Sequence, residues 1–161
     1  MKTAELFALS CELSGCLGGT GAPARKALRQ FGLAFGTAYQ IYDDCLDLYG
    51  TEAVAGKSLG TDLSTGKLTL PILIVLEKGT KSDREMLQSC IENLEAENLE
   101  RIFELLEKYG ALSDTRRVVT QYIKQAQQVL GELEQSKGAR GIHALAALGD
   151  YLAQQTRALG V

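Results

Sequence analysis

The sequence predicts an all-α protein, and two observations carry that prediction. Apolar residues recur with the 3.6-residue period of a helix through most of the chain, as at Leu28, Phe31, Phe35 and Ala38. No stretch alternates apolar and polar residues with the two-residue period of a strand. We therefore expect helices joined by turns.

The breaks between the expected helices fall at glycine-rich and polar segments. A turn at Gly18–Gly21 precedes Pro23, and residues 50–66, with four glycines, are expected to form a longer loop. Pro71 suits the first turn of a helix that begins near Thr69. Three further turns are expected, at residues 79–82, 109–113 and 136–141. The predicted helices span roughly residues 2–16, 22–49, 68–78, 83–94, 97–109, 114–135 and 140–157.

The composition is that of a globular protein with a single domain. The chain has 161 residues, of which 45% are hydrophobic and 23% are charged, and its formal net charge is -3. This charge gives no reason to expect nucleic acid or an anionic membrane as a partner. No apolar run approaches the length of a membrane span, and no signal peptide is recognisable. We therefore expect a cytoplasmic protein.

The cysteines and the histidine exclude several kinds of site. Cys11, Cys16, Cys45 and Cys90 form no C-x-x-C pair, so we expect buried free thiols and neither a disulfide framework nor a zinc site. His143 is the only histidine, which excludes catalysis by several histidines.

An acidic stretch inside an otherwise apolar helix is the most informative segment. Gln40, Asp43 and Asp47 fall on one helical face, and Asp44 lies at its edge. The opposite face carries side chains that we expect in the core: Phe31, Phe35, Ala38, Ile41 and Cys45. An Asp pair at i,i+4 repels by about 0.2–0.5 kcal/mol, and a divalent cation resolves that conflict. Oxygen-only ligands favour magnesium, whereas the simpler alternative is a solvated acidic face.

The loop that follows supplies the opposite charge. Lys57 and Lys67 each come directly after a glycine. A lysine ammonium is a compact point charge that suits phosphate oxygens. Acidic residues, lysines and glycines together indicate a diphosphate bridged by Mg2+, although either lysine alone could be an ordinary surface charge.

Three segments in order resemble motifs of the trans-polyprenyl (isoprenyl) diphosphate synthases. Tyr39–Asp47 is similar to the second aspartate-rich motif of that family, FQxxDDxxD, and Gly56–Pro71 is similar to its GKxxGxDLxxGKxTLP segment. Lys2-Thr3-Ala4 resembles its GKTA helix, with Met1 in place of glycine. The resemblance implies an antiparallel helical bundle of the isoprenoid synthase type. Its members join isopentenyl diphosphate to an allylic diphosphate by ionising the allylic carbon–oxygen bond.

The resemblance also implies a role for each matching residue. Asp43 and Asp44 are expected to bind the Mg2+ that bridges the allylic diphosphate, with Asp47 as a weaker or indirect ligand. Diphosphate contacts are expected from Lys2, Lys57 and Lys67. Thr3 and Gln40 are expected to orient the substrate near the developing carbocation, so the expected catalytic residues are Lys2, Thr3, Gln40 and Lys57.

One element of the family pattern has no counterpart here. The family carries a first aspartate-rich motif on an earlier helix, whereas Asp43-Asp44 is the only Asp-Asp pair in this chain. Residues 1–161 are therefore expected to be the C-terminal portion of a polyprenyl synthase domain whose N-terminal half is missing. We expect little prenyl transfer by this chain alone, and either a homo-oligomer or association with the missing half. The alternative is a non-catalytic helical regulatory subunit that partners a complete synthase.

Overall fold

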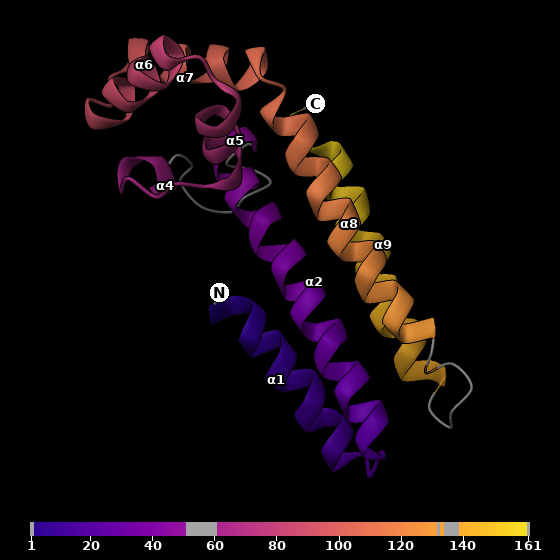
Figure 1. The fold of residues 1–161 in the computed structure, drawn as a ribbon. Helices are drawn as coiled ribbons and strands as arrows, with labels where there is room; N and C mark the ends of the chain where they lie inside the picture. Colours follow the sequence, from indigo (N-terminus) through magenta and orange to yellow (C-terminus); the bar gives the residue numbers. More distant parts are fainter. Residues whose placement is uncertain (1, 51–60, 132, 134–138, 161) are drawn as a thin grey trace. The chain divides into compact units, whose positions relative to one another are not determined.

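The computed structural model describes residues 2–50, 61–131, 133 and 139–160, and within these ranges it contains helices and no strand (Figure 1). The all-α prediction is thus confirmed. The helices are α1 (Lys2–Leu17), α2 (Ala22–Tyr49), α4 (Thr61–Ser64), α5 (Leu70–Lys78), α6 (Lys81–Glu92), α7 (Ala96–Lys108), α8 (Ala111–Gly131) and α9 (Ala139–Ala158). None of the described helices is long and apolar enough to cross a membrane.

Most helix boundaries agree with the predicted ones, and the exceptions have local causes. The predicted turn at residues 79–82 is shorter than expected, because the Thr80 side chain accepts a hydrogen bond from the Asp83 backbone N–H and starts α6 at Lys81. Helix α8 likewise begins at Ala111, three residues early, because Gly110 adopts a left-handed φ of 62° and reverses the chain in one step.

The segment expected to be a loop is the clearest miss. Its last part contains the short helix α4, followed by Gly66 with a φ of 71°. Residues 51–60 lie outside the described part of the chain. The expectation for Pro71 is confirmed, since α5 has Thr69 at its N-cap position and proline in its first turn.

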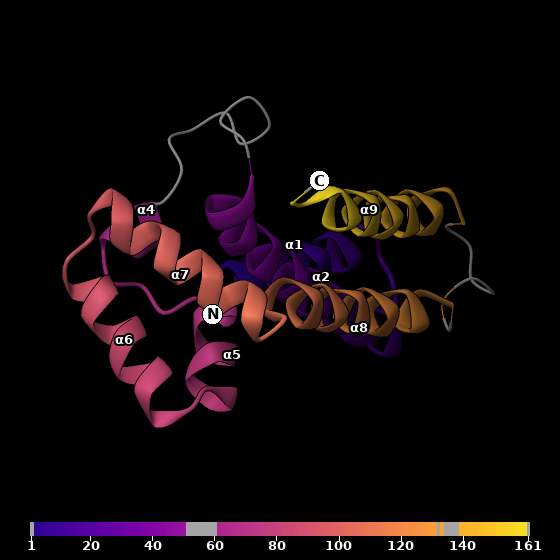
Figure 2. The same ribbon diagram turned by 90° about the horizontal axis from the view of Figure 1, so that it is seen from above.

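The chain divides into two compact units, and each is described separately. Unit 1 comprises the described residues of Met1–Gln40 and Val118–Ala158. It contains α1, most of α2 and α8, and α9, with α1 antiparallel to α2 and α8 antiparallel to α9 (Figures 1 and 2). The buried apolar residues of this unit are Ala4, Ala8, Ala27, Phe31, Phe35, Ala38, Val119, Ile123, Ala126, Leu130, Ile142 and Leu152.

Small residues let α1 and α2 approach closely within unit 1. A Cβ atom added at Gly32 would lie 2.5 Å from the Phe7 carbonyl oxygen, and one added at Gly36 would lie 2.9 Å from Ala4 Cα. Gly36 lies one helical turn before Gln40 on α2, and in the structure this glycine is a helix-packing position. The Phe7 ring packs against the Phe35 ring in an edge-to-face arrangement, with ring centroids 5.5 Å apart.

Unit 2 comprises the described residues of Ile41–Arg117 and Leu159–Val161. Its core is formed by Leu48, Leu63, Ile72, Ile74, Val75, Leu87, Cys90, Ile102, Leu105, Leu106 and Ala111. Helices α6 and α7 lie side by side as an antiparallel pair in this unit (Figure 2). The core residue Leu48 comes from the end of α2 that carries the acidic stretch, and Leu63 comes from α4. The acidic stretch and the segment after it are therefore held by the same core.

The cysteines are free, as predicted, but only two of the four are buried. Cys45 and Cys90 are buried, whereas Cys11 is half-buried and Cys16 is exposed. The expectation of buried thiols was wrong for the two cysteines of α1, whose outer face is exposed to solvent along its length.

Candidate metal and diphosphate site

The acidic stretch of α2 is largely withdrawn from solvent. Asp44 is 9% exposed and Asp47 is 2% exposed, while Asp43 is half-buried. The opposite face lies mainly in the core, as predicted, with Ile41 only half-buried. A solvated acidic face is therefore excluded for Asp44 and Asp47. Buried carboxylates are costly without partners, so their hydrogen bonds and ion pairs define the site.

Asp47 binds the backbone of the segment that follows the loop. Its Oδ2 atom accepts a hydrogen bond from the Asp62 backbone N–H at 2.9 Å. Asp62 is in the first turn of α4, where backbone N–H groups have no partner within the helix. Asp47 thus ties α4 to α2, a role that sequence reasoning did not foresee.

Lys67 places its ammonium group between two carboxylates. The Nζ atom lies 2.8 Å from Asp44 Oδ1 and 2.8 Å from Asp62 Oδ2. Desolvation lowers the pKa of Lys67, but the hydrogen bonds to Asp44 and then Asp62 outweigh it, so that the pKa is raised. The ammonium is therefore a permanent cation at the buried carboxylate of Asp44.

Asp62 is a member of this group that received no role from the sequence. Its backbone N–H binds Asp47, its carboxylate binds Lys67, and its carbonyl oxygen accepts a hydrogen bond from the Lys67 backbone N–H at 2.9 Å. An isolated acidic residue within a segment of lysines and glycines was the signal that could have identified it.

Cys45 lies beside these acids and remains a neutral thiol. Burial, and secondly the charge of Asp44, raise the pKa of Cys45 to about 12. A thiol that stays protonated is neither a nucleophile nor a metal ligand under ordinary conditions.

Two other predicted site residues are joined in unit 1. The Thr3 hydroxyl donates a hydrogen bond to Gln40 Oε1 at 2.6 Å, across 37 positions of sequence. This contact fixes the Gln40 amide through the first turn of α1. Lys2 is the first residue of that helix and its side chain is exposed. Lys57 lies outside the described residues.

The chemistry of the donors fits Mg2+ bound jointly with phosphate. In the part of the chain that the structure describes, no three His, Cys, Asp or Glu side chains converge to hold a metal ion by themselves. Magnesium usually keeps several waters and binds through one or two carboxylates plus substrate phosphates. Asp43 and Asp44 supply oxygen donors of that kind, and a cation already lies against Asp44.

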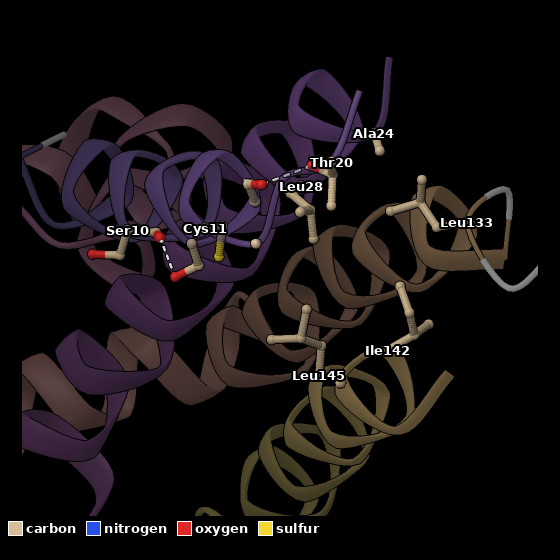
Figure 3. A pocket seen from close by; sticks show the side chains of 12 residues that line it. Ser10, Cys11, Thr20, Ala24, Leu28, Leu133, Ile142 and Leu145 are labelled. Carbon is tan, nitrogen blue, oxygen red and sulfur yellow. Dashed lines mark hydrogen bonds between the residues drawn. The ribbon is translucent and has the colours of Figure 1, made fainter. Parts of the chain in front are cut away.

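A separate pocket of about 560 Å³ lies within unit 1 (Figure 3). It is lined by α1, the turn after it, the start of α2, Leu133 and the start of α9, with the apolar side chains of Leu28, Ile142 and Leu145 among its walls. None of the predicted site residues lines this pocket. We therefore assign it no part in the candidate diphosphate chemistry.

Comparison with known proteins gives a consistent result. Residues 1–109 match the family described as polyprenyl synthetase. The chain is 32% identical over 154 residues to the short chain isoprenyl diphosphate synthase of Methanothermobacter thermautotrophicus, which covers 96% of this chain and 46% of that protein. It is 36% identical over 155 residues to heptaprenyl diphosphate synthase component 2 of Bacillus subtilis, covering 96% of this chain and 43% of that protein.

A solved structure shares both the fold and the sequence. The polyprenyl synthase of Caulobacter crescentus, complexed with calcium and isoprenyl diphosphate, superposes with a TM-score of 0.84 at 31% identity, over 94% of this chain and 46% of that chain. The fold is thus the all-α isoprenoid synthase fold, and the chain spans about half the length of the curated relatives it matches. The matched residues cover more than half of the sequence, and the chain belongs to the polyprenyl synthetase family.

Proposed function

We propose that this chain binds an allylic diphosphate through Mg2+, as the C-terminal half of a trans-polyprenyl diphosphate synthase. The observation that carries the proposal is the buried Asp44 carboxylate with Lys67 and Asp62 assembled against it. Carboxylates that can bind a metal, beside an ammonium that can bind phosphate, are the groups that a metal-bridged diphosphate requires. Family membership supports the same chemistry.

The site residues divide into metal ligands and diphosphate contacts. Asp43 and Asp44 bind Mg2+, and Asp47 supports them through the backbone of Asp62. Lys67, Lys57 and Lys2 contact diphosphate oxygens. The metal, when bound, neutralises negative charge on the diphosphate as the allylic carbon–oxygen bond breaks.

The lysines assist catalysis because negative charge grows on the departing diphosphate. When the allylic carbon–oxygen bond ionises, the electron pair leaves with the diphosphate, whose negative charge grows. Ammonium groups fixed against the departing oxygens stabilise that state more than the intact substrate. The Gln40 amide accepts a hydrogen bond from the Thr3 hydroxyl at its Oε1 atom. We propose that this pair orients the substrate beside the developing carbocation.

A thermal melt tests the binding function. Inorganic pyrophosphate with MgCl2 should raise the melting temperature, because a ligand that binds only the folded state stabilises it by RT ln(1 + [L]/Kd). Pyrophosphate with EDTA should not. Equal protection with and without the metal would contradict a metal-bridged site.

We further propose that the 161-residue chain alone has little prenyl transfer activity. It contains a single Asp-Asp pair, whereas the family resemblance implies two acidic motifs. Its steady-state turnover with MgCl2, an allylic diphosphate and isopentenyl diphosphate should stay near background. Addition of a polypeptide that carries the first acidic motif should restore activity. Robust turnover by the chain alone would refute this part of the proposal.

The surface of α1 suggests how a partner is held. Its exposed leucines fall at i, i+3, i+7 and i+11 and form one stripe, the α1 leucine face: Leu6, Leu9, Leu13 and Leu17. Leucines at this spacing are more than a helix usually leaves in water. We propose that a second copy of the chain packs on this face.

A regulatory subunit is the second candidate function. One relative is named as a component of a heptaprenyl diphosphate synthase, and that name motivates a role beside a complete enzyme. Such a role does not require Asp43, Asp44 and Lys67 together. Stimulation of a complete synthase by a variant with all three replaced would favour the regulatory role over the catalytic one.

A further inference from the structure

Lys67 forms ion pairs with the carboxylates of Asp44 and Asp62, and the proposed function does not by itself explain this double pairing. The ammonium is bound at equal distances, 2.8 Å, by Asp44 and Asp62. The two acids differ in origin, because Asp44 belongs to α2 and Asp62 belongs to α4. The same ammonium therefore pairs with a proposed metal ligand and with a residue that has no proposed contact to metal or substrate.

Backbone contacts fix the position of this lysine. The Lys67 backbone N–H donates to the Asp62 carbonyl, and the Asp62 backbone N–H donates to Asp47, each at 2.9 Å. The first of these hydrogen bonds joins the two ends of the segment 62–67, and the second joins the segment to α2. The ammonium is held at Asp44 by a short, tied segment and does not reach it from a distant part of the surface.

A cation at this place competes with any metal for the same carboxylate. Asp44 Oδ1 accepts a hydrogen bond from the Lys67 ammonium, and the Asp44 side chain is only 13% exposed. Because little water reaches this carboxylate, the ammonium compensates its negative charge. To bind Asp44, Mg2+ alone would have to displace the ammonium from the carboxylate. A lysine has three donors on a flexible stem, so it can release one acceptor and keep another.

We infer that Lys67 is the resident counter-ion of Asp44 and that it moves from Asp44 to the diphosphate when metal and diphosphate bind, while Asp62 retains it as a pivot. This inference rests on the proposed function. Diphosphate offers the displaced ammonium a new anionic partner, which Mg2+ alone does not. The metal and the diphosphate must then bind with positive coupling, and the coupling must be reciprocal.

The inference predicts effects of opposite sign for one substitution. The Lys67→Met substitution removes a cation that competes with the metal for Asp44, so binding of Mg2+ alone should strengthen, by about 5-fold or more. The same change removes a diphosphate contact, so pyrophosphate at saturating Mg2+ should bind about 10-fold more weakly. A lysine that only contacted phosphate would leave the affinity for Mg2+ alone unchanged.

Isothermal titration of the full chain separates these outcomes. MgCl2 is titrated alone, and pyrophosphate is then titrated at saturating MgCl2, into the unmodified chain, Lys67→Met and Lys67→Gln. Lys81→Met is the matched control, because Lys81 is 90% exposed and lies in the same unit. Circular dichroism melts establish that each variant is folded. If Lys67→Met is not folded, the comparison is made with Lys67→Gln.

The outcomes distinguish the inference from the proposed function. Stronger Mg2+ binding with weaker pyrophosphate binding, in the Lys67 variants alone, supports the inference. Unchanged or weaker Mg2+ binding in a folded Lys67 variant overturns the inference and leaves the proposed function in place. Failure of the unmodified chain to bind pyrophosphate with MgCl2 overturns the proposed function and the inference with it.

Discussion

Asp44 and Asp47 are three positions apart on α2, yet their carboxylates have partners of different kinds. Asp44 binds the ammonium of a side chain, and Asp47 binds a backbone N–H. A side-chain cation can exchange for a metal, whereas a backbone donor has a fixed position. The two acids of one motif thus divide into a group that can release its partner and a group that holds the segment in place.

The role of Asp47 leads to a prediction about stability. Asp47→Ala leaves the Asp62 N–H without its acceptor and should lower the free energy of unfolding by about 1–3 kcal/mol. Asp47→Asn keeps an oxygen that can accept this bond and should lose less. Urea unfolding followed by circular dichroism measures both. Equal losses in the two variants would show that the hydrogen bond to Asp62 is not what Asp47 contributes.

The sequence predicted several residues of this site, but not the contacts between them. Spacing placed Gln40, Asp43 and Asp47 together, and the position of Lys67 after a glycine in the following segment selected it as a charged partner, as did the resemblance. Neither could reveal the Asp47–Asp62 bond, because it depends on how the chain after residue 60 folds back onto α2. Lys57 remains a prediction, since it lies outside the described residues.

Helix α1 packs closely against α2 because the glycines at their contact have no side chains. At Gly32 and Gly36 an added Cβ would meet backbone atoms of α1, which cannot turn aside as a flexible side chain can. This contact went unpredicted because a hydrophobic period marks apolar side chains, whereas a close approach is marked by Ala4, Ala8 and two glycines at four-residue spacing.

A pair of glycine substitutions tests that packing. Gly32→Ala should destabilise the chain by about 1–3 kcal/mol, because the core must shift to admit the methyl group. Gly141→Ala is the control, since an added Cβ there meets nothing within 4 Å. It should raise stability by about 0.4–1 kcal/mol. Comparison of the urea midpoints decides the matter, and similar effects of the two substitutions would argue against a close α1–α2 contact.

The hairpin of α6 and α7 is fastened by one carboxylate. Tyr109 O–H donates to Asp83 Oδ2 at 2.5 Å, Thr80 O–H donates at 2.7 Å, and Lys108 Nζ lies at 2.9 Å. The hydrogen bonds from Tyr109, Thr80 and Lys108 hold the pKa of Asp83 well below its usual range. The contact between Asp83 and Tyr109, which lie 26 positions apart, could not be predicted from the sequence.

The lowered pKa of Asp83 makes the stability depend on pH. The group binds a proton more readily in the unfolded chain, so its contribution is complete above the ordinary Asp pKa of about 3.9 and is lost as the pH falls through the folded value. Tyr109→Phe removes the largest cause of the shift. Its melting temperature should be lower at pH 6 and should fall less between pH 6 and pH 3 than that of the unmodified chain.

Tyr151→Phe is the control for this measurement, because Tyr151 is exposed. Its melting temperatures should follow those of the unmodified chain at every pH. If Tyr109→Phe does the same, the Asp83 cluster makes no contribution to the pH dependence.

For the whole molecule, the α1 leucine face predicts self-association. Leu13→Lys puts a charge in the middle of that face, where a packed second copy would have to desolvate it. The variant should shift the chain toward monomer at concentrations where the unmodified chain associates, as measured by light scattering. Leu148→Lys, at an exposed leucine of α9, is the matched control. A chain that is monomeric at every concentration would contradict the proposed contact.

The proposed function depends on Asp43 and Asp44 binding a diphosphate only through Mg2+. Isothermal titration with pyrophosphate tests this most directly, using the unmodified chain, the double variant Asp43→Asn/Asp44→Asn and the control Asp150→Asn. The unmodified chain and the control should bind in MgCl2 and not in EDTA, and the double variant should bind at least about 10-fold more weakly, a loss of about 1.4 kcal/mol. Binding of pyrophosphate in EDTA, or undiminished binding by the double variant, would contradict the proposed function.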